Sequence, residues 1–223
     1  MSSSGAIALS WSGGKDSALA LRALREVRGV EPRALITTIT SEYERVSMHG
    51  VRRSLLERQA DNLGLPLVAV TIPPGCSNAV YEERWLGALA SDELDGIEEV
   101  AFGDLFLEDV RAYRETLLAR AGKRAVFPLW GMDTGQVARG FVADGFRAIL
   151  VCVDPKHLDP AFSGREYDHV LLDRLPAVVD PCGERGEFHT FVYAGPCFAE
   201  PIGCRVGPVV ERDGFVFCDL TEE

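Results

Sequence analysis

The feature that most constrains this chain is the hexapeptide SGGKDS at residues 12–17, which stands between an apolar run and an amphipathic segment. The apolar run at residues 6–9 predicts a buried strand, and the apolar spacing after residue 17 predicts a helix. Gly13 and Gly14 allow a sharp turn and let an anion approach the backbone closely. The N–H groups of the first helical turn then form an anion site, which the helix dipole strengthens.

The side chains of the hexapeptide add to this anion site. Lys15 supplies a positive charge in a lysine-poor chain, Ser12 and Ser17 supply hydroxyl donors, and Asp16 can orient these groups or help to hold Mg²⁺. The arrangement predicts a polyphosphate cradle. It is not the Walker pattern, which needs four residues between a glycine and Gly-Lys-Ser/Thr. An ordinary serine–glycine turn before a helix is the alternative interpretation.

In its strand–turn–helix context, SGGKDS resembles the PP-loop of the ATP pyrophosphatase superfamily, whose enzymes cleave ATP between the α and β phosphates. The resemblance implies that the chain uses ATP and that the loop holds the phosphates that become pyrophosphate. It does not identify the acceptor, the molecule that receives the AMP group. The nucleotide site predicted in this way contains Ser10, Ser12, Gly13, Gly14, Lys15, Asp16, Ser17, Gly103 and Asp104.

The composition predicts a cytoplasmic protein. The chain has 223 residues, of which 47% are hydrophobic, and no apolar run reaches the roughly 18–20 residues that span a bilayer. Its first residues lack the basic region and cleavage site of a signal peptide. Its six cysteines form no CxxC pair and no zinc-ligand spacing, so we expect reduced thiols. The net charge of −11 argues against a nucleic-acid partner.

Strands that alternate with helices of ten to fifteen residues predict an α/β fold with a doubly wound parallel sheet, covered on both faces. The expected strands after the first are residues 34–40, 67–72, 99–102, 125–130 and 148–153. Beyond Asp154 the alternation gives way to turns and short β-like segments. We therefore expect a PP-loop ATP-binding domain over residues 1–153. A small C-terminal α+β extension over residues 154–223 is expected to complete the acceptor pocket.

Ligands of open α/β sheets bind beyond the carboxyl ends of the strands, where the strand order reverses. In the PP-loop fold the first and fourth strands are neighbours at that point, so Gly103 and Asp104 are expected to face the SGGKDS loop. Asp104 is a candidate for holding Mg²⁺, together with Asp16, or for positioning the reacting groups. An acidic residue at a helix start is the alternative for Asp104.

A second cluster of polar residues follows Asp180 and includes Glu184, Glu187, His189 and Thr190. Two glutamates three residues apart, followed by a histidine, concentrate acceptors and a titratable group in one loop. Such a loop can order an ammonium nucleophile, accept protons during amine attack or recognise a cationic substrate. A solvated acidic turn before a strand is the alternative.

Taken together, several segments resemble the diphthine–ammonia ligase family and its bacterial relatives. They are SGGKDS, MHGV at residues 48–51, FGDLFLEDVRAYRE at 102–115, FPLWGMDT at 127–134 and CGERGEFHTFV at 182–192. The resemblance implies an ATP-dependent, AMP-forming amide ligase that adenylates a carboxylate and lets ammonia displace AMP. The implied catalytic residues are Lys15, Asp16, Asp104, Glu184 and Glu187, and the implied acceptor site contains His49, Glu184, Glu187, His189 and Thr190.

Two residues depart from the family's pattern. Arg185 replaces a glycine and His189 replaces a glutamate of the motif Gly-Glu-Gly-Gly-Glu-Phe/Tyr-Glu-Thr. Diphthine carries a quaternary ammonium group, which acidic or aromatic surroundings favour, so the changes make the pocket better suited to an anion. The resemblance to relatives of this histidine-bearing type implies a corrinoid carboxylate as one acceptor. The acceptor is thus a small molecule or a modified protein side chain, with ammonium as the nitrogen source, and a homodimer is one option for the assembly.

Two other functions remain open for a PP-loop protein. One is an RNA-modifying enzyme, which the acidic balance and the absence of a basic stripe disfavour. The other is a nucleotide sensor that binds ATP without chemistry, which has no need of a second polar pocket.

Overall fold

The computed structural model describes residues 5–223 and contains two sheets. The first has the order β3-β2-β1-β5-β6, and β4 also pairs with β2. Every pair in it is parallel except β2 with β3. Its strands are β1 (Ala6–Ser10), β2 (Ala34–Thr40), β3 (Arg45–Val46), β4 (Leu67–Ile72), β5 (Ile97–Ala101) and β6 (Arg124–Val126). This arrangement confirms the predicted α/β fold.

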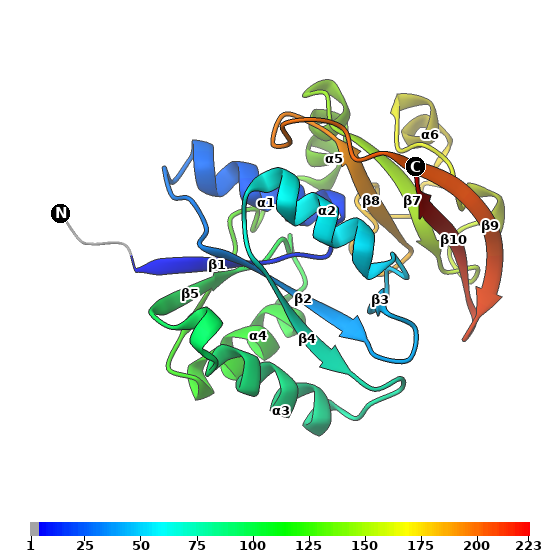
Figure 1. Ribbon diagram of the computed structural model, residues 1–223. Coiled ribbons are helices and arrows are strands. Elements are labelled where there is room, and N and C mark those ends of the chain that lie inside the picture. The colour runs from blue at the N-terminus through cyan, green and yellow to red at the C-terminus, as the bar shows by residue number, and fades with distance from the viewer. Residues whose placement is uncertain (1–4) are drawn as a thin grey trace.

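Helices cover both faces of this sheet (Figure 1). The apolar side chains of α3 and α4 pack in one core with the sheet, while those of α1 and α2 belong to a second core on the opposite face. Burial on both sides explains why the central strand β1 is apolar over residues 6–9. The helices are α1 (Lys15–Glu26), α2 (Arg53–Leu63), α3 (Asn78–Leu89), α4 (Glu108–Arg120), α5 (Thr134–Ala143) and α6 (His169–Arg174).

The second sheet is antiparallel, has the order β8-β7-β10-β9 and lies on the α1/α2 side of the first (Figure 1). Its strands are β7 (Arg147–Val153), β8 (Phe188–Ala194), β9 (Cys204–Arg212) and β10 (Phe215–Glu222). The expectation that β7 continues the parallel sheet was wrong. A wholly apolar run shows that a strand is buried on both faces but does not reveal its partners. The predicted division of the chain after residue 153 stays a prediction.

Local signals account for several element ends. Asp133 caps α5, and its carboxylate accepts a hydrogen bond of 2.8 Å from the backbone N–H of Gln136. Gly64 ends α2 in the left-handed conformation. All six cysteines are free, as expected. Across residues 5–223, no helix combines the length and the apolar character required to cross a membrane.

The two sheets meet at the hexapeptide. The backbone N–H of Val192 in β8 donates a hydrogen bond of 2.8 Å to the carbonyl oxygen of Gly13. Strand β8 also contacts α1 directly. The C-terminal sheet therefore packs directly against the SGGKDS loop.

Candidate functional site

The SGGKDS loop turns between β1 and α1 in a conformation that requires both glycines. Gly13 has a φ of +76°, and a Cβ there would lie 2.8 Å from the side-chain oxygen of Gln59. A Cβ on Gly14 would lie 3.0 Å from the carbonyl oxygen of Thr190. The loop is thus held tightly between α2 and β8, with its helix beginning at Lys15.

Gln59, a residue that the sequence analysis did not select, braces the loop from α2. Its side chain is fully buried and accepts a hydrogen bond of 2.8 Å from the indole N–H of Trp11. Its amide donates to the carbonyl oxygens of Gly13, at 3.2 Å, and Val192, at 2.6 Å. A glutamine on the apolar face of a helix, beside Leu55, Leu56 and Ala60, was the available signal.

The hydroxyl groups near the loop are engaged with its backbone. Thr190 accepts a hydrogen bond of 3.1 Å from the backbone N–H of Lys15. Ser17 donates to the carbonyl oxygen of Gly14 at 2.8 Å, and Ser12 accepts from the N–H of Gly14 at 3.3 Å. These bonds shape the first helical turn. Ser10 is half-buried at the end of β1.

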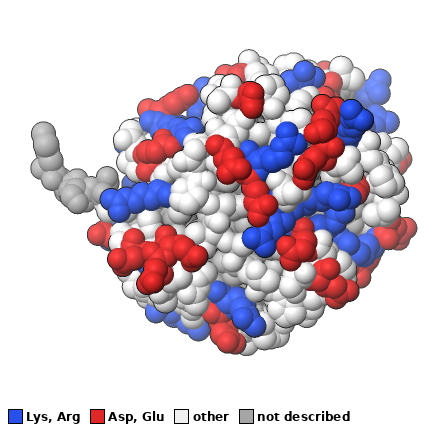
Figure 2. All heavy atoms as spheres, viewed as in Figure 1, with Lys and Arg blue, Asp and Glu red and all other residues white. Residues whose placement is uncertain are grey.

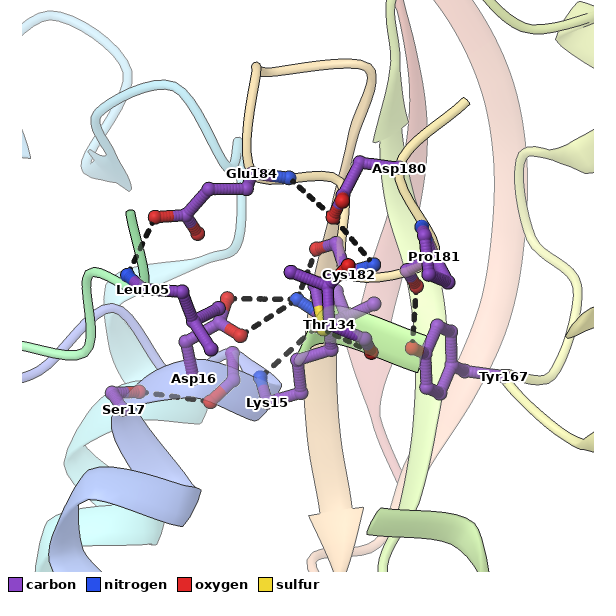
Figure 3. A network of polar contacts seen from close by, with 12 residues as sticks. Lys15, Asp16, Ser17, Leu105, Thr134, Tyr167, Asp180, Pro181, Cys182 and Glu184 are labelled. Carbon is purple, nitrogen blue, oxygen red and sulfur yellow. Dashed lines mark hydrogen bonds and ion pairs between the residues drawn. The ribbon is translucent and has the colours of Figure 1, made fainter. Parts of the chain in front are cut away.

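Lys15 is buried and lies at the centre of the site (Figure 3). Its ammonium nitrogen is 2.8 Å from each carboxylate oxygen of Asp16 and also donates to the carbonyl oxygen of Cys182. Burial by itself favours the neutral amine, but the Asp16 carboxylate, together with Cys182 and Glu184, outweighs burial and holds the pKa of Lys15 above its ordinary value. Lys15 is therefore a charged link between the two predicted motifs.

The second motif folds as a braced loop beside Lys15. Both carboxylate oxygens of the buried Glu187 accept backbone N–H bonds, from Asp180 at 2.9 Å and from Arg185 at 3.0 Å. Gly183 has a φ of +66°, and a Cβ there would lie 2.7 Å from the carbonyl oxygen of Phe188. The loop is consequently fixed in shape before any ligand arrives.

Glu184 points from this loop toward the strand-end of β5, where it accepts a hydrogen bond of 2.7 Å from the backbone N–H of Leu105 (Figure 3). Burial raises the pKa of Glu184 to about 7, and the negative charges of Asp16 and Asp104 add to the increase. A carboxyl group with a pKa near neutrality is suited to proton transfer at neutral pH.

Gly103 and Asp104 lie against the SGGKDS loop. A Cβ on Gly103 would be 2.7 Å from the backbone carbonyl group of Asp16, so the β5 strand-end packs closely on the first turn of α1. Asp104 forms an ion pair of 2.7 Å with Arg114 of α4. No local sequence pattern indicates this pairing, because the two residues are ten positions apart and lie on different segments.

His49 and His189 stack with a centroid separation of 4.3 Å and an interplanar angle of 28°. Burial lowers the pKa of His49 to about 4, and it also lowers the pKa of His189 well below its usual range. The His189 Nε2 atom is buried and has no hydrogen-bond partner among residues 5–223. The structure thus brings these two predicted acceptor-site residues together as a neutral pair.

The carboxylates of the site suit a metal ion that is coordinated mainly by the phosphates that carry it. Within residues 5–223, no group of three or more His, Cys, Asp or Glu side chains is placed to hold a metal by itself. Asp16 and Asp104 lie on adjoining segments, and each is ion-paired with a basic residue. Mg²⁺ that arrives on phosphates needs only one or two protein carboxylates, so the pair fits such an ion.

Basic and acidic side chains are interspersed over the face shown in Figure 2, and no extended basic stripe crosses it. A nucleic-acid backbone is bound by clustered Lys and Arg side chains. This face therefore lacks that electrostatic footprint.

Comparisons with known proteins give matches over most of the chain. A family model described as the diphthamide synthase N-terminal domain matches residues 5–125, and the diphthamide synthase C-terminal domain matches residues 133–212. The chain is similar to the diphthine–ammonia ligase of Danio rerio, with 26% identity over 163 residues, covering 64% of this chain and 62% of the relative. It is similar to that of Schizosaccharomyces pombe, with 28% identity over 128 residues, covering 56% of this chain and 21% of the relative. The chain therefore spans less than two thirds of the length of either relative.

Proposed function

This chain belongs to the diphthamide synthase family, and from that premise we propose that it is an ATP-dependent, AMP-forming amide ligase. The observation that supports the proposal most is the contact of Lys15 with the carbonyl oxygen of Cys182. It joins the loop suited to phosphates with the loop that carries Glu184. A protein that only bound nucleotide would have no need of that second loop.

We assign nucleotide binding to the SGGKDS loop. Its backbone N–H groups, the N-terminus of α1 and the charge of Lys15 stabilise the negative charge that develops on pyrophosphate. Ser12, Ser17 and Gly103 shape the site, because their hydroxyl or backbone groups lie in or against the loop, and Ser10 ends the strand that leads into it. Asp16 and Asp104 would hold Mg²⁺, which neutralises phosphate charge when it is bound.

The chemistry proceeds in two balanced steps. A carboxylate oxygen of the acceptor attacks the α phosphorus of ATP, which forms an acyl–adenylate and releases pyrophosphate. Ammonia then attacks the acyl carbon, the bond to AMP breaks, and the amide nitrogen loses one proton. Glu184 is the proposed proton acceptor, because its pKa of about 7 matches this task near neutral pH. Glu187 positions Glu184, since its carboxylate holds the backbone of their loop.

We place the acceptor beside His49, His189 and Thr190, which connect β8 to the SGGKDS loop. Two relatives are named for a reaction of diphthine with ammonia, and their names contain no corrinoid. The expectation of a corrinoid acceptor therefore has no support from the comparisons, and we propose only a carboxylate acceptor with ammonia as nitrogen donor. The cytoplasmic location and the homodimer stay predictions.

Nucleotide product analysis tests this function. The purified chain is incubated with ATP, Mg²⁺ and ammonium, with and without a panel of carboxylates that includes a diphthine-bearing elongation factor. AMP and pyrophosphate that accumulate with one acceptor are the expected products. ADP and phosphate would show that a different bond of ATP is cleaved. Tight ATP binding without turnover by any acceptor would favour the nucleotide sensor instead.

A further inference from the structure

A cavity of about 430 Å³ lies beyond the carboxyl ends of β2 and β4, under the β9–β10 hairpin. Its walls come from the end of β2, the β3 region, the turn after β4, the start of α3 and the hairpin. The members that matter for recognition are Tyr43, Arg45, Arg212, Asp213 and Phe217. The catalytic assignments above use none of these residues.

Arg212 occupies the aromatic part of the cavity. Its guanidinium carbon lies 4.4 Å from the centroid of the Tyr43 ring and 4.9 Å from that of Phe217. Among residues 5–223, no carboxylate forms an ion pair with this guanidinium, and no side-chain hydrogen bond is directed to it. The two rings hold the planar group in place while leaving its N–H donors available.

The other charges at the cavity do not neutralise Arg212. Asp219 of β10 is already paired with two other arginines, at 2.8 Å from Arg45 and 2.6 Å from Arg52. Asp213 is the one acidic side chain among the lining residues, and it is exposed at the tip of the hairpin. An acidic chain with a net charge of −11 thus keeps an unneutralised guanidinium in a cavity.

The segment of residues 47–50 borders both the cavity and the SGGKDS loop. Ser47, Met48 and Gly50 line the cavity. Between them, His49 places its Nε2 atom near Gly14, 3.4 Å from the position that a Cβ on that glycine would take. A ligand in the cavity would therefore contact the segment that carries His49.

The segment of residues 47–50 also packs against the β9–β10 hairpin. A Cβ on Gly50 would lie 2.5 Å from the ring of Phe217. Any larger residue there would collide with this ring, which packs beside Arg212. Met48 has a φ of +65°, which is uncommon for a residue other than glycine. One short segment thus lines the cavity and carries the His49 imidazole.

We propose that this cavity binds the part of the acceptor that lies beyond His49, away from the activated carboxylate, and that Arg212 selects acceptors carrying a second anionic group there, a carboxylate or a phosphate. The inference rests on the proposed ligase function. A quaternary ammonium group is disfavoured at this point, because the ring faces that would hold it already hold the chain's own guanidinium. Arg212 is thus a specificity-determining residue of the acceptor site.

Three probes of similar length test the proposal: glutarate, 4-phosphonobutyrate and 4-(trimethylammonio)butyrate. All three have a carboxylate at one end, and the other end is a second carboxylate, a phosphonate or a trimethylammonium group respectively. Binding to the full chain is followed by ¹H–¹⁵N chemical-shift titration without ATP, and ATP affinity is measured separately by calorimetry. At least one anionic probe is expected to bind about tenfold more tightly than the trimethylammonium probe. The tighter of the two anionic probes distinguishes a carboxylate from a phosphate.

Arg212→Gln is expected to weaken the anionic probe by at least about tenfold and to leave ATP affinity within about twofold. Arg205→Gln is the matched control, because Arg205 lies exposed on the same strand. If thermal denaturation shows that Arg212→Gln is unfolded, Arg212→Met is used in its place, because it keeps the apolar stem between the rings. It is expected to weaken the anionic probe in the same way.

Three results would overturn the proposal. They are failure of both anionic probes to bind, unchanged binding in the Arg212 variants, and an equal loss of ATP affinity, which would assign the cavity to the nucleotide. The probe titration does not depend on turnover. Anion binding without AMP formation therefore contradicts the ligase function alone, whereas AMP formation without anion binding contradicts only the role of Arg212.

Discussion

The ammonium group of Lys15 donates a hydrogen bond to the carbonyl oxygen of Cys182, a residue 167 positions away along the chain. The same ammonium group is paired with Asp16, so one buried cation connects the phosphate-binding loop with the loop of Glu184. Because the contact needs both loops in place, the proposed nucleotide site and the proposed proton-transfer site form together or not at all.

Lys15→Met is expected to abolish AMP formation, because the variant loses the positive charge that stabilises pyrophosphate. It leaves Asp16 without its cation, and the free energy of unfolding should fall by about 1–3 kcal/mol. Product chromatography and urea denaturation measure the two effects. Lys156→Met is the control, since Lys156 is exposed and far from the loop along the chain. A folded Lys15→Met protein with normal AMP formation would remove Lys15 from the mechanism.

Glu184→Gln is expected to separate the two chemical steps. Glutamine can still accept the hydrogen bond from Leu105 but cannot take up a proton, so adenylation should continue while amide formation slows by about 10²–10⁴-fold. Pyrophosphate exchange reports the first step, and ammonium-dependent AMP release reports the second. Equal loss of both rates would assign Glu184 to the nucleotide site rather than to proton transfer.

Gln59→Leu is expected to lower the free energy of unfolding by about 1–3 kcal/mol, because Trp11, Gly13 and Val192 lose a buried hydrogen-bond partner. ATP affinity should fall as well, since the bond to Gly13 holds the SGGKDS loop. Urea denaturation and calorimetry measure these quantities. The exposed Gln136 provides the matched variant, Gln136→Leu, for which both quantities should stay unchanged. A stable Gln59→Leu protein with normal ATP affinity would contradict the bracing role.

The stability of the protein is expected to depend on pH between about 4 and 6.5 through His49. Burial lowers the folded-state pKa of His49 to about 4, whereas an unfolded histidine has a pKa of about 6.5. The unfolded chain therefore binds a proton more readily than the folded protein does. The contribution of neutral His49 to the free energy of unfolding is complete above about pH 6.5 and is lost as the pH falls toward 4. The backbone carbonyl of Ser47 and the charge of Lys15 face the ring, and His189 stacks on it.

His49→Phe keeps the stack with His189 and removes one titrating group. Urea denaturation at several pH values should therefore show a shallower loss of stability between about pH 6.5 and 4. His189 acts in the same direction, because its pKa is also lowered by burial, so part of the dependence remains. His157→Phe is the control, as the His157 side chain is 58% exposed. An unchanged pH dependence in His49→Phe would show that His49 is not neutral in the folded protein.

Periodic patterns predicted much of the fold because they record local burial. Residues 34–40 form β2 as expected, and α1 begins inside the SGGKDS motif. The same patterns missed β3, whose two residues are too few to show an alternation. They also placed β7 in the wrong sheet, because an apolar strand of either sheet has the same sequence pattern.

The sequence by itself determined the chemistry of the loop: two glycines, a lysine and a helix start that favour phosphate, within an α/β order of elements. Only the tertiary structure decided what surrounds that loop. The packing of β8 on α1 brings Thr190 to the N–H of Lys15 and the carbonyl of Cys182 to its ammonium group. The position of Arg212 between Tyr43 and Phe217 was decided in the same way. A side chain's own sequence neighbours fix its local conformation, but its distant contacts depend on how whole elements pack against one another.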